Sequence, residues 1–205
     1  MKLQLALDRL TRDECLQIVS ETEKLIDLIE VGTGVIKEYG MAIVRQMRDL
    51  YPDKIIVADM KTCDAGGHEA KQAFEAGADI VTVMAFSSDL TIKETLKVAA
   101  EYGKQVMVDL LEVISRDRLA ELQNISVNLV SLHVGIDKQQ EGNFNTDLFN
   151  LVKGFDFEVS VAGGINLDTF IDIVQEKPDT IIVGSAITKA ENPKEAATKM
   201  KNMLS

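Results

Sequence analysis

Short apolar segments alternate with longer amphipathic segments from one end of this chain to the other. Eight of the apolar segments are continuous and rich in β-branched residues, a composition typical of parallel strands that are covered on both faces. These predicted strands cover residues 3–7, 25–31, 54–60, 79–84, 105–110, 128–133, 158–162 and 179–184. The alternation therefore favours an α/β fold built on a parallel sheet.

The segments between the predicted strands carry apolar residues close to the helical period. The predicted helices cover residues 12–22, 35–51, 67–76, 90–102, 115–122, 145–152, 167–175 and 193–203. Thr11 and Glu14 have the spacing of a capping box at the start of the first helix, and Pro193 suits the first turn of the last one.

Eight strand–helix units without a linker or a break in composition predict a (β/α)8 barrel, the TIM barrel, as a single domain over residues 1–205 with short loops. A doubly wound open sheet is the alternative architecture. No Gly-x-Gly-x-x-Gly follows the first predicted strand, where a dinucleotide site in such a sheet would require it.

Composition excludes several kinds of partner. The net charge of −11 on 205 residues argues against nucleic acid or an anionic membrane as the main partner. Cys15 and Cys63 are too few and too far apart for a disulfide framework or a zinc site, which favours a reducing, cytoplasmic environment. No apolar run is long enough to span a membrane, and Asp8 and Arg9 interrupt the apolar start before a signal peptide is complete.

Polar and ionisable residues collect at the ends of the predicted strands. In a barrel, functional groups lie at these C-terminal strand ends. The residues are Asp8, Glu30, Asp59 with Lys61, Asp109 and His133, at the ends of strands one, two, three, five and six. A single carboxylate in such a place can simply cap the next helix, and this alternative applies most to Asp8 and Asp109. Five strands ending in this way favour a shared polar cavity, in which His133 could move protons rather than serve only as a structural residue.

The third strand end, residues 55–67, places two carboxylates and an amine within six residues. Strand alternation puts Asp59 and Lys61 on one face and Met60 on the other. A charge in an apolar setting needs a partner, a metal or a polar ligand. Taken alone, this stretch is equally consistent with a strand-end salt bridge and with a functional site. Cys63, in the same stretch, is expected to be a free structural thiol.

The last two strands end in glycines rather than in charged residues. Gly163 and Gly164 follow the seventh strand, and Gly184 and Ser185 follow the eighth. Glycines allow backbone N–H groups to approach an anion closely, and loops seven and eight of barrels often bind phosphate. We therefore predict a phosphate site at these four residues.

Two of the strand-end carboxylates are suited to a metal. Glu30 and Asp59 are hard oxygen ligands on adjacent strands, which suits Mg²⁺ with its few protein carboxylates and its retained water or substrate oxygens. Lys61 would add a positive charge beside the metal. Together they would stabilise an oxyanion such as an enediolate.

These residues also carry a family resemblance over essentially the whole chain. Asp59-x-Lys61-x-x-Asp64 resembles the signature of the orotidine 5'-phosphate decarboxylase suprafamily. Within it, the chain resembles the 3-hexulose-6-phosphate synthase family through four segments: Glu30-Val31-Gly32-Thr33, Lys61-Thr62-x-Asp64-Ala65-Gly66, His133-x-Gly135-x-Asp137 and Ala162-Gly163-Gly164-Ile165.

Three positions separate this family from its sibling, the 3-keto-L-gulonate 6-phosphate decarboxylases. The decarboxylases carry Glu, Arg and Thr where this chain has Asp109, Ile136 and Ala162, whereas the synthases carry Asp, an aliphatic residue and Ala. All three positions agree with the synthase family. Orotidine decarboxylase itself uses no metal and a charged Asp–Lys–Asp–Lys array, and Val57 stands where the first Lys of that array would be sought.

The resemblance implies an aldehyde-lyase that condenses formaldehyde with D-ribulose 5-phosphate to D-arabino-hex-3-ulose 6-phosphate. It implies Mg²⁺ held by Glu30 and Asp59, His133 as the base for the C1 proton, and Lys61 as the charge that stabilises the enediolate.

The resemblance further implies that Asp8 and Asp109 orient substrate hydroxyls, with Ile136 and Ala162 beside the substrate. It implies a homodimer in which Asp64 reaches the partner's active site.

The sibling family has an Arg where this chain has Ser185, which implies that backbone amides hold most of the phosphate here. Two other functions remain open: the sibling decarboxylation, alone or as a second activity, and a catalytically silent phosphosugar-binding barrel. The latter would be marked by loss of Glu30, Asp59, Lys61 or His133, and all four are present.

Overall fold

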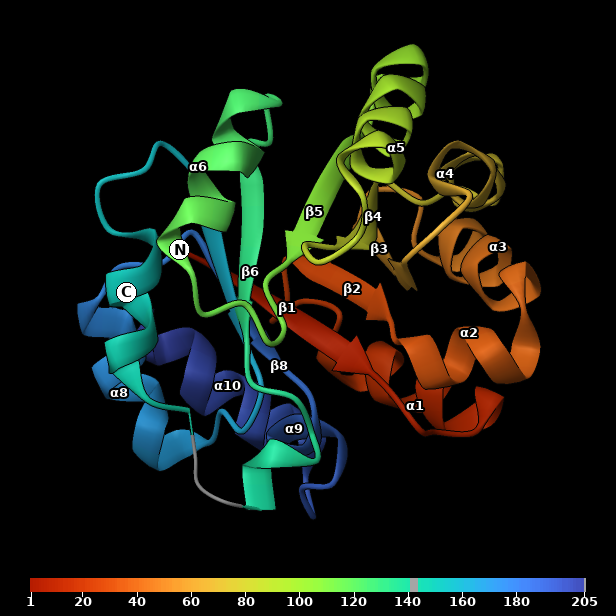
Figure 1. Cartoon of the computed structure of the whole chain (residues 1–205). Coiled ribbons are helices and arrows are strands. Elements are labelled where there is room, and N and C mark those ends of the chain that lie inside the picture. The colour runs from red at the N-terminus through yellow and green to blue at the C-terminus, as the bar shows by residue number, and fades with distance from the viewer. Residues whose placement is uncertain (141–143, 205) are drawn as a thin grey trace.

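The strands form one closed barrel of parallel strands. A computed structural model describes residues 1–140 and 144–204. Its strands pair in chain order from β1 to β8, and β8 pairs with β1 to close the barrel (Figure 1). Their bounds are β1 Lys2–Leu7, β2 Leu28–Val31, β3 Ile55–Thr62, β4 Ile80–Met84, β5 Gln105–Asp109, β6 Leu129–His133, β7 Glu158–Ala162 and β8 Thr180–Val183. The predicted (β/α)8 barrel is confirmed, and the pairing of β1 with β8 rules out the open sheet.

Helices surround the barrel and connect consecutive strands (Figure 1). They are α1 Arg12–Thr22, α2 Thr33–Tyr39, α3 Met41–Leu50, α4 Gly66–Glu75, α5 Asp89–Tyr102, α6 Arg116–Asn124, α7 Phe149–Val152, α8 Leu167–Gln175, α9 Ser185–Thr188 and α10 Pro193–Met203, with 3-10 turns η1 Lys138–Gln140 and η2 Thr146–Leu148. The predicted capping box of Thr11 and Glu14 is present. Across residues 1–140 and 144–204, none of the helices has both the length and the apolarity to cross a bilayer.

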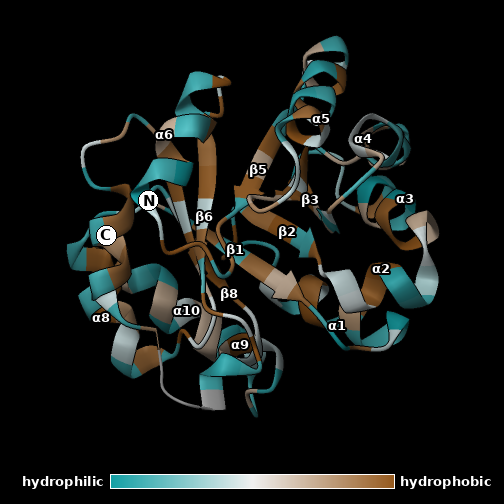
Figure 2. Cartoon of the chain, viewed as in Figure 1, coloured by the Kyte–Doolittle hydropathy of each residue, from teal (hydrophilic) through white to brown (hydrophobic). Residues whose placement is uncertain are grey.

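The apolar core has two parts because successive strand residues point to opposite faces. The larger part lies between strands and helices and includes Leu5, Ile29 and Ile56. The smaller part fills the inside of the barrel with Leu28, Val57, Ile80, Met107, Leu129 and Ile182. Figure 2 shows mostly hydrophobic strands enclosed by helices of mixed hydropathy. The inner cluster fills the barrel beneath the polar strand ends, and the cavity lies above it on the C-terminal side.

Some helix predictions were wrong in their bounds. The single helix predicted over 35–51 is two helices, because Gly40 has a φ of 62° and ends α2 before α3 begins. Only Phe149–Val152 of the helix predicted over 145–152 is α-helical, and a 3-10 turn precedes it. Helix α9 was not predicted, and its four residues leave too short a pattern to detect.

The end of β3 departs from regular strand geometry. The register against β4 shifts between Ala58 and Thr62, and Lys61 has a φ of 46°. The amide of Lys61 donates to the Thr82 hydroxyl at 2.9 Å instead of to a neighbouring strand carbonyl. Asp59 and Lys61 still enter the barrel cavity while Met60 packs against the outer core, so the predicted division of faces is confirmed.

Candidate active site

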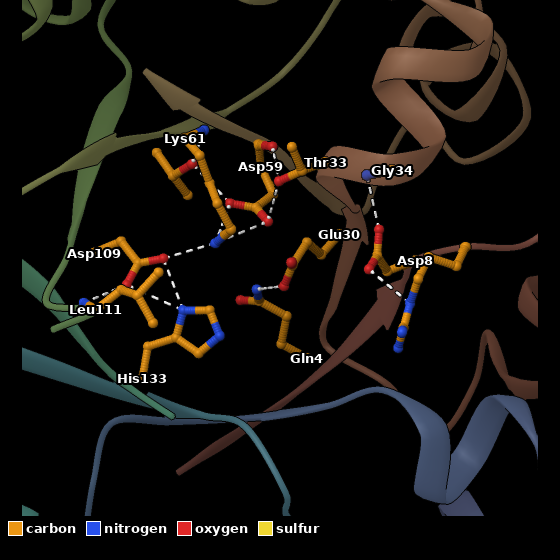
Figure 3. Close-up of polar contacts among 12 residues, drawn as sticks. Gln4, Asp8, Glu30, Thr33, Gly34, Asp59, Lys61, Asp109, Leu111 and His133 are labelled. Atoms are coloured by element: carbon orange, nitrogen blue, oxygen red, sulfur yellow. Dashed lines mark hydrogen bonds and ion pairs between the residues drawn. The ribbon is translucent and has the colours of Figure 1, made fainter. Parts of the chain in front are cut away.

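A cavity of about 310 Å³ lies at the C-terminal ends of the strands. It is lined by most of the residues predicted from the sequence: Asp8, Glu30, Asp59, Lys61, Asp109, His133, Ile136, Ala162, Gly163, Gly164, Gly184 and Ser185. The barrel therefore brings together side chains from strands that are far apart in the sequence (Figure 3). Asp64 is the exception and does not line this cavity.

Lys61 lies at the centre of the polar network. Its Nζ is 2.7 Å from Asp109 Oδ2 and 3.2 Å from Asp59 Oδ2, between the two carboxylates (Figure 3). Burial alone would lower the pKa of Lys61, but the charges of Asp59 and Asp109 outweigh burial and raise the pKa above its ordinary value. Lys61 is therefore a permanent cation. The strand-end salt bridge exists, and it lies within the site.

Two threonine hydroxyls hold the Asp59 carboxylate. The Thr82 hydroxyl donates to Oδ1 at 2.8 Å, and the Thr33 hydroxyl lies 2.8 Å from Oδ2 and 2.7 Å from the Asp59 carbonyl oxygen. Asp59 is buried. Because these contacts come from β4 and from the start of α2, the carboxylate is fixed from two directions before any ligand binds.

Asp109 connects Lys61 to His133. Asp109 is only 3% exposed, and its Oδ2 lies 2.8 Å from His133 Nδ1. Its Oδ1 accepts from the amide of Leu111 at 2.9 Å. Burial would raise the pKa of Asp109, but the hydrogen bond and charge of His133, together with Lys61, lower it to about 2.

The ionised Asp109 determines the tautomer of His133. An ionised carboxylate can only accept hydrogen bonds, so Nδ1 of His133 must carry the proton that points to it. In the neutral ring Nε2 then presents a lone pair. That lone pair is a position at which His133 can accept a proton.

Glu30 is the least favourably placed carboxylate. It is 9% exposed and accepts a 2.6 Å hydrogen bond from Gln4 Nε2. Burial, followed by the charge of Asp59, raises the pKa of Glu30 to about 8. The positive charge that the protein places near Glu30 and Asp59 is therefore too small to keep Glu30 ionised at neutral pH.

This donor set fits a hard divalent cation. Glu30 and Asp59 offer carboxylate oxygens on neighbouring strands, and a cation would relieve their burial and repulsion. Within residues 1–140 and 144–204, no group of three or more His, Cys, Asp or Glu side chains could hold a metal. A metal at this pair would thus take only two protein carboxylates, which suits Mg²⁺ because it keeps water or substrate oxygens as further ligands.

The glycine segments line the opposite side of the cavity, after β7 and β8. Gly163 has a φ of 97°, and a Cβ there would lie 2.0 Å from the Val134 carbonyl oxygen, so only glycine fits. Asn166 caps α8 and accepts from the amides of Asp168 and Thr169. Because Asn166 already accepts from these two amides, we look for anion-binding N–H groups in the glycine segments themselves, which include Ser185 at the start of α9.

The remaining predicted residues lie at the edge of the site or outside it. Asp8 accepts from the amide of Gly34 at 2.8 Å, so it does cap a helix, although that helix is α2 rather than the next one, α1. Ile136 is 49% exposed at the cavity edge. Asp64 is exposed, and its carboxylate accepts from its neighbour Ala65. Its role in a partner's site stays a prediction.

Sequence reasoning assigned no role to three polar residues, Gln4, Thr33 and Thr82, although Thr33 belongs to one of the segments that carry the family resemblance. Gln4 is fully buried inside the barrel, and among the described residues its Oε1 has no hydrogen-bond partner. Gln4 and Thr82 interrupt apolar strands at inward-facing positions, and this was the signal that could have identified them. Thr33 lies on a helix, where only the fold shows its proximity to Asp59.

The comparisons with known proteins identify the family. The model of the Orotidine 5'-phosphate decarboxylase / HUMPS family matches residues 1–200. The chain belongs to this family. A relative named 3-hexulose-6-phosphate synthase from Bacillus subtilis is 39% identical, with the match covering 100% of this chain and 99% of the relative. The resemblance stated from the sequence is confirmed.

Solved structures of family members have the same fold. The structure of 3-hexulose-6-phosphate synthase from Salmonella typhimurium superposes with a TM-score of 0.97 at 38% identity and covers 100% of this chain and 98% of its own. A structure of KGPDC from Streptococcus mutans has a TM-score of 0.94 at 30% identity and covers 99% of this chain and 96% of its own. The relatives named as synthases are lyases, which agrees with the predicted enzyme class.

Proposed function

We propose that this family member is a 3-hexulose-6-phosphate synthase, a cytoplasmic aldehyde-lyase that condenses formaldehyde with D-ribulose 5-phosphate to D-arabino-hex-3-ulose 6-phosphate. The observation that carries the proposal is the way Asp109 bridges Lys61 and His133. The shorter Asp side chain, with Ile136 and Ala162 in the same cavity, matches the residues expected of the synthases at all three positions. The names of the relatives support the same activity.

The proposed reaction begins at His133. Its Nε2, free because Nδ1 donates to Asp109, takes the proton from C1 of the sugar phosphate. Negative charge then develops on the neighbouring sugar oxygens, and the ammonium of Lys61 stabilises it. Since Lys61 remains protonated between its two carboxylates, it acts by charge and not as a base.

Carbon–carbon bond formation follows. C1 of the sugar attacks the formaldehyde carbon, and the formaldehyde oxygen receives the proton that His133 had taken, so atoms and charge balance. The apolar side chain of Ile136 offers C1 of the enediolate no proton donor that would compete with formaldehyde. Asp8 and Asp109 orient sugar hydroxyls, and the backbone of Gly163, Gly164, Gly184 and Ser185 holds the phosphate.

We propose Mg²⁺ as the cofactor, held by Glu30 and Asp59. When bound, it supplies a Lewis acid that polarises the substrate carbonyl. Gln4 donates to Glu30, and Thr33 and Thr82 contact Asp59, so both carboxylates are already oriented toward the cavity.

We also propose that the protein is a homodimer with shared active sites. Asp64 lies outside the cavity of its own chain, so it is available to another. A C2 pair of barrels would carry the carboxylate of each protomer into the site of the other.

NMR of the reaction with ¹³C-formaldehyde, D-ribulose 5-phosphate and Mg²⁺ tests the proposed activity. The label is expected at C1 of a new hexulose phosphate. The likeness at 28% identity to a structure of 3-keto-L-gulonate-6-phosphate decarboxylase from Vibrio cholerae favours one second candidate, decarboxylation of 3-keto-L-gulonate 6-phosphate. Release of CO₂ from that compound without consumption of formaldehyde would overturn the synthase assignment.

A further inference from the structure

Lys189 is a cationic side chain of the cavity that has no role in the chemistry described above. The cationic side chains of Arg9, Lys61 and Lys189 line the cavity. Lys61 is bound between two carboxylates, and Arg9 Nε lies 3.4 Å from Asp8. Among residues 1–140 and 144–204, nothing forms an ion pair or hydrogen bond with the Lys189 side chain. A dianion can use Lys189 without displacing a carboxylate.

Lys189 follows directly after α9, next to the glycine segments. Its amide donates to the Ser185 carbonyl oxygen at 3.0 Å, so it lies one helical turn after Ser185, the first residue of α9. Figure 1 shows α9 beside the C-terminal end of the barrel. Lys189 and Ser185 line the same cavity, so the lysine side chain faces the space beside the glycine segments. One turn rises about 5.4 Å, a length that an extended lysine side chain can span.

The glycine segments themselves offer no charge. Gly163, Gly164, Gly184 and Ser185 contribute backbone amides and one hydroxyl, all neutral donors. The cavity also carries the carboxylates of Glu30, Asp59 and Asp109, which repel a phosphate dianion. A neutral amide cradle beside these carboxylates needs a cation to make phosphate binding strong.

We propose that Lys189 is a phosphate-binding residue that supplies the counter-charge for the phosphate group of the sugar substrate. The inference rests on the proposed function, because it assigns the phosphate end of that substrate to the β7 and β8 side of the cavity. Lys189 binds substrate in the ground state and in the transition state alike, so its contribution lies in affinity.

The test measures binding separately from turnover. Isothermal titration gives the dissociation constants of D-ribulose 5-phosphate, inorganic phosphate and unphosphorylated D-ribulose for the wild type, Lys189→Met, Lys189→Arg and Lys194→Met. Lys194 is an exposed lysine outside the cavity, so its variant makes the same change in net charge.

Lys189→Met is expected to weaken binding of both phosphate compounds by about tenfold or more and to leave D-ribulose binding unchanged. Lys189→Arg should restore most of the loss, and Lys194→Met should bind as the wild type does. In turnover, the loss should fall on KM rather than on kcat, and added salt should weaken phosphate binding less in Lys189→Met than in the wild type.

Unchanged phosphate affinity in Lys189→Met, with a wild type that binds phosphate, would overturn the role of Lys189 and leave the proposed function standing. A wild type that binds D-ribulose 5-phosphate with this lysine dependence but forms no hexulose phosphate would overturn the proposed function and leave Lys189 as a phosphate ligand.

Discussion

Replacing Glu30 with Gln is expected to stabilise the protein, and by more at high pH than at low pH. Burial and Asp59 raise the pKa of Glu30 from 4.5 to about 8. A group whose folded pKa is raised contributes its full stability below its unfolded pKa and loses it as the pH rises through the folded value. At about 1.4 kcal/mol per unit, ionisation of Glu30 lowers the free energy of unfolding by less than about 1 kcal/mol at pH 5 and by up to about 5 kcal/mol at pH 9.

Urea unfolding of the wild type and Glu30→Gln at pH 5 and pH 9, with EDTA present, measures this effect. The difference in unfolding free energy between the two proteins should grow by about 4 kcal/mol from pH 5 to pH 9, because other ionisable groups cancel. Glu38→Gln is the matched control, since Glu38 is exposed. A Glu30→Gln difference that stays constant across the two pH values within about 1 kcal/mol would refute the reasoning.

The same pair of proteins tests the metal. Mg²⁺ should raise the unfolding free energy of the wild type at pH 9, because the cation offsets the repulsion between Glu30 and Asp59. It should raise that of Glu30→Gln far less. Equal stabilisation of both proteins would place the ion elsewhere.

Three further predictions concern the site. His133→Ala and Lys61→Ala should each lower formaldehyde consumption at least about 100-fold with an unchanged circular dichroism spectrum; retained turnover in either would contradict its role. Mixing Asp64→Ala with Lys61→Ala subunits should restore up to about a quarter of wild-type activity, because half of the randomly paired dimers then carry one complete site out of two. If activity does not recover after subunit exchange has been verified, the active sites are not shared. Gly163→Ala should lower the free energy of unfolding by about 2 kcal/mol or more in urea titration, because its Cβ would lie 2.0 Å from the Val134 carbonyl oxygen; a neutral effect would contradict the close approach.

The strand ends were predictable because burial leaves a clear mark on the sequence. A charged side chain would be too costly to bury within an apolar run such as the Ile-Ile-Val before Asp59. The first ionisable residue after such a run therefore marks where the polar cavity begins. Once the barrel was inferred, the proximity of Asp109 and His133 followed from their shared end of adjacent strands. Periodicity and topology together were sufficient for this part of the site.

Other features depend on energies that local patterns do not contain. The helix breaks at Gly40 because this glycine has a positive φ. Glycine also occurs inside helices, so the sequence alone did not mark a break, and the continuous apolar period led to the prediction of one helix over 35–51. The register shift around Lys61 depends on its bond to Thr82 across the sheet. The contact of Thr33 with Asp59 likewise arises from tertiary packing.

The closure of the barrel has a consequence for how the protein folds. The carboxylates and Lys61 come from the first five strands, whereas the glycine segments follow the last two, and the pairing of Lys2 with Thr180 joins the two halves. This contact closes nearly the longest loop available in the chain, which makes it entropically the most expensive strand pairing. If the proposed sugar phosphate binds from the glycines to the carboxylates, it would cross that contact and stabilise the pairing of the first and last strands.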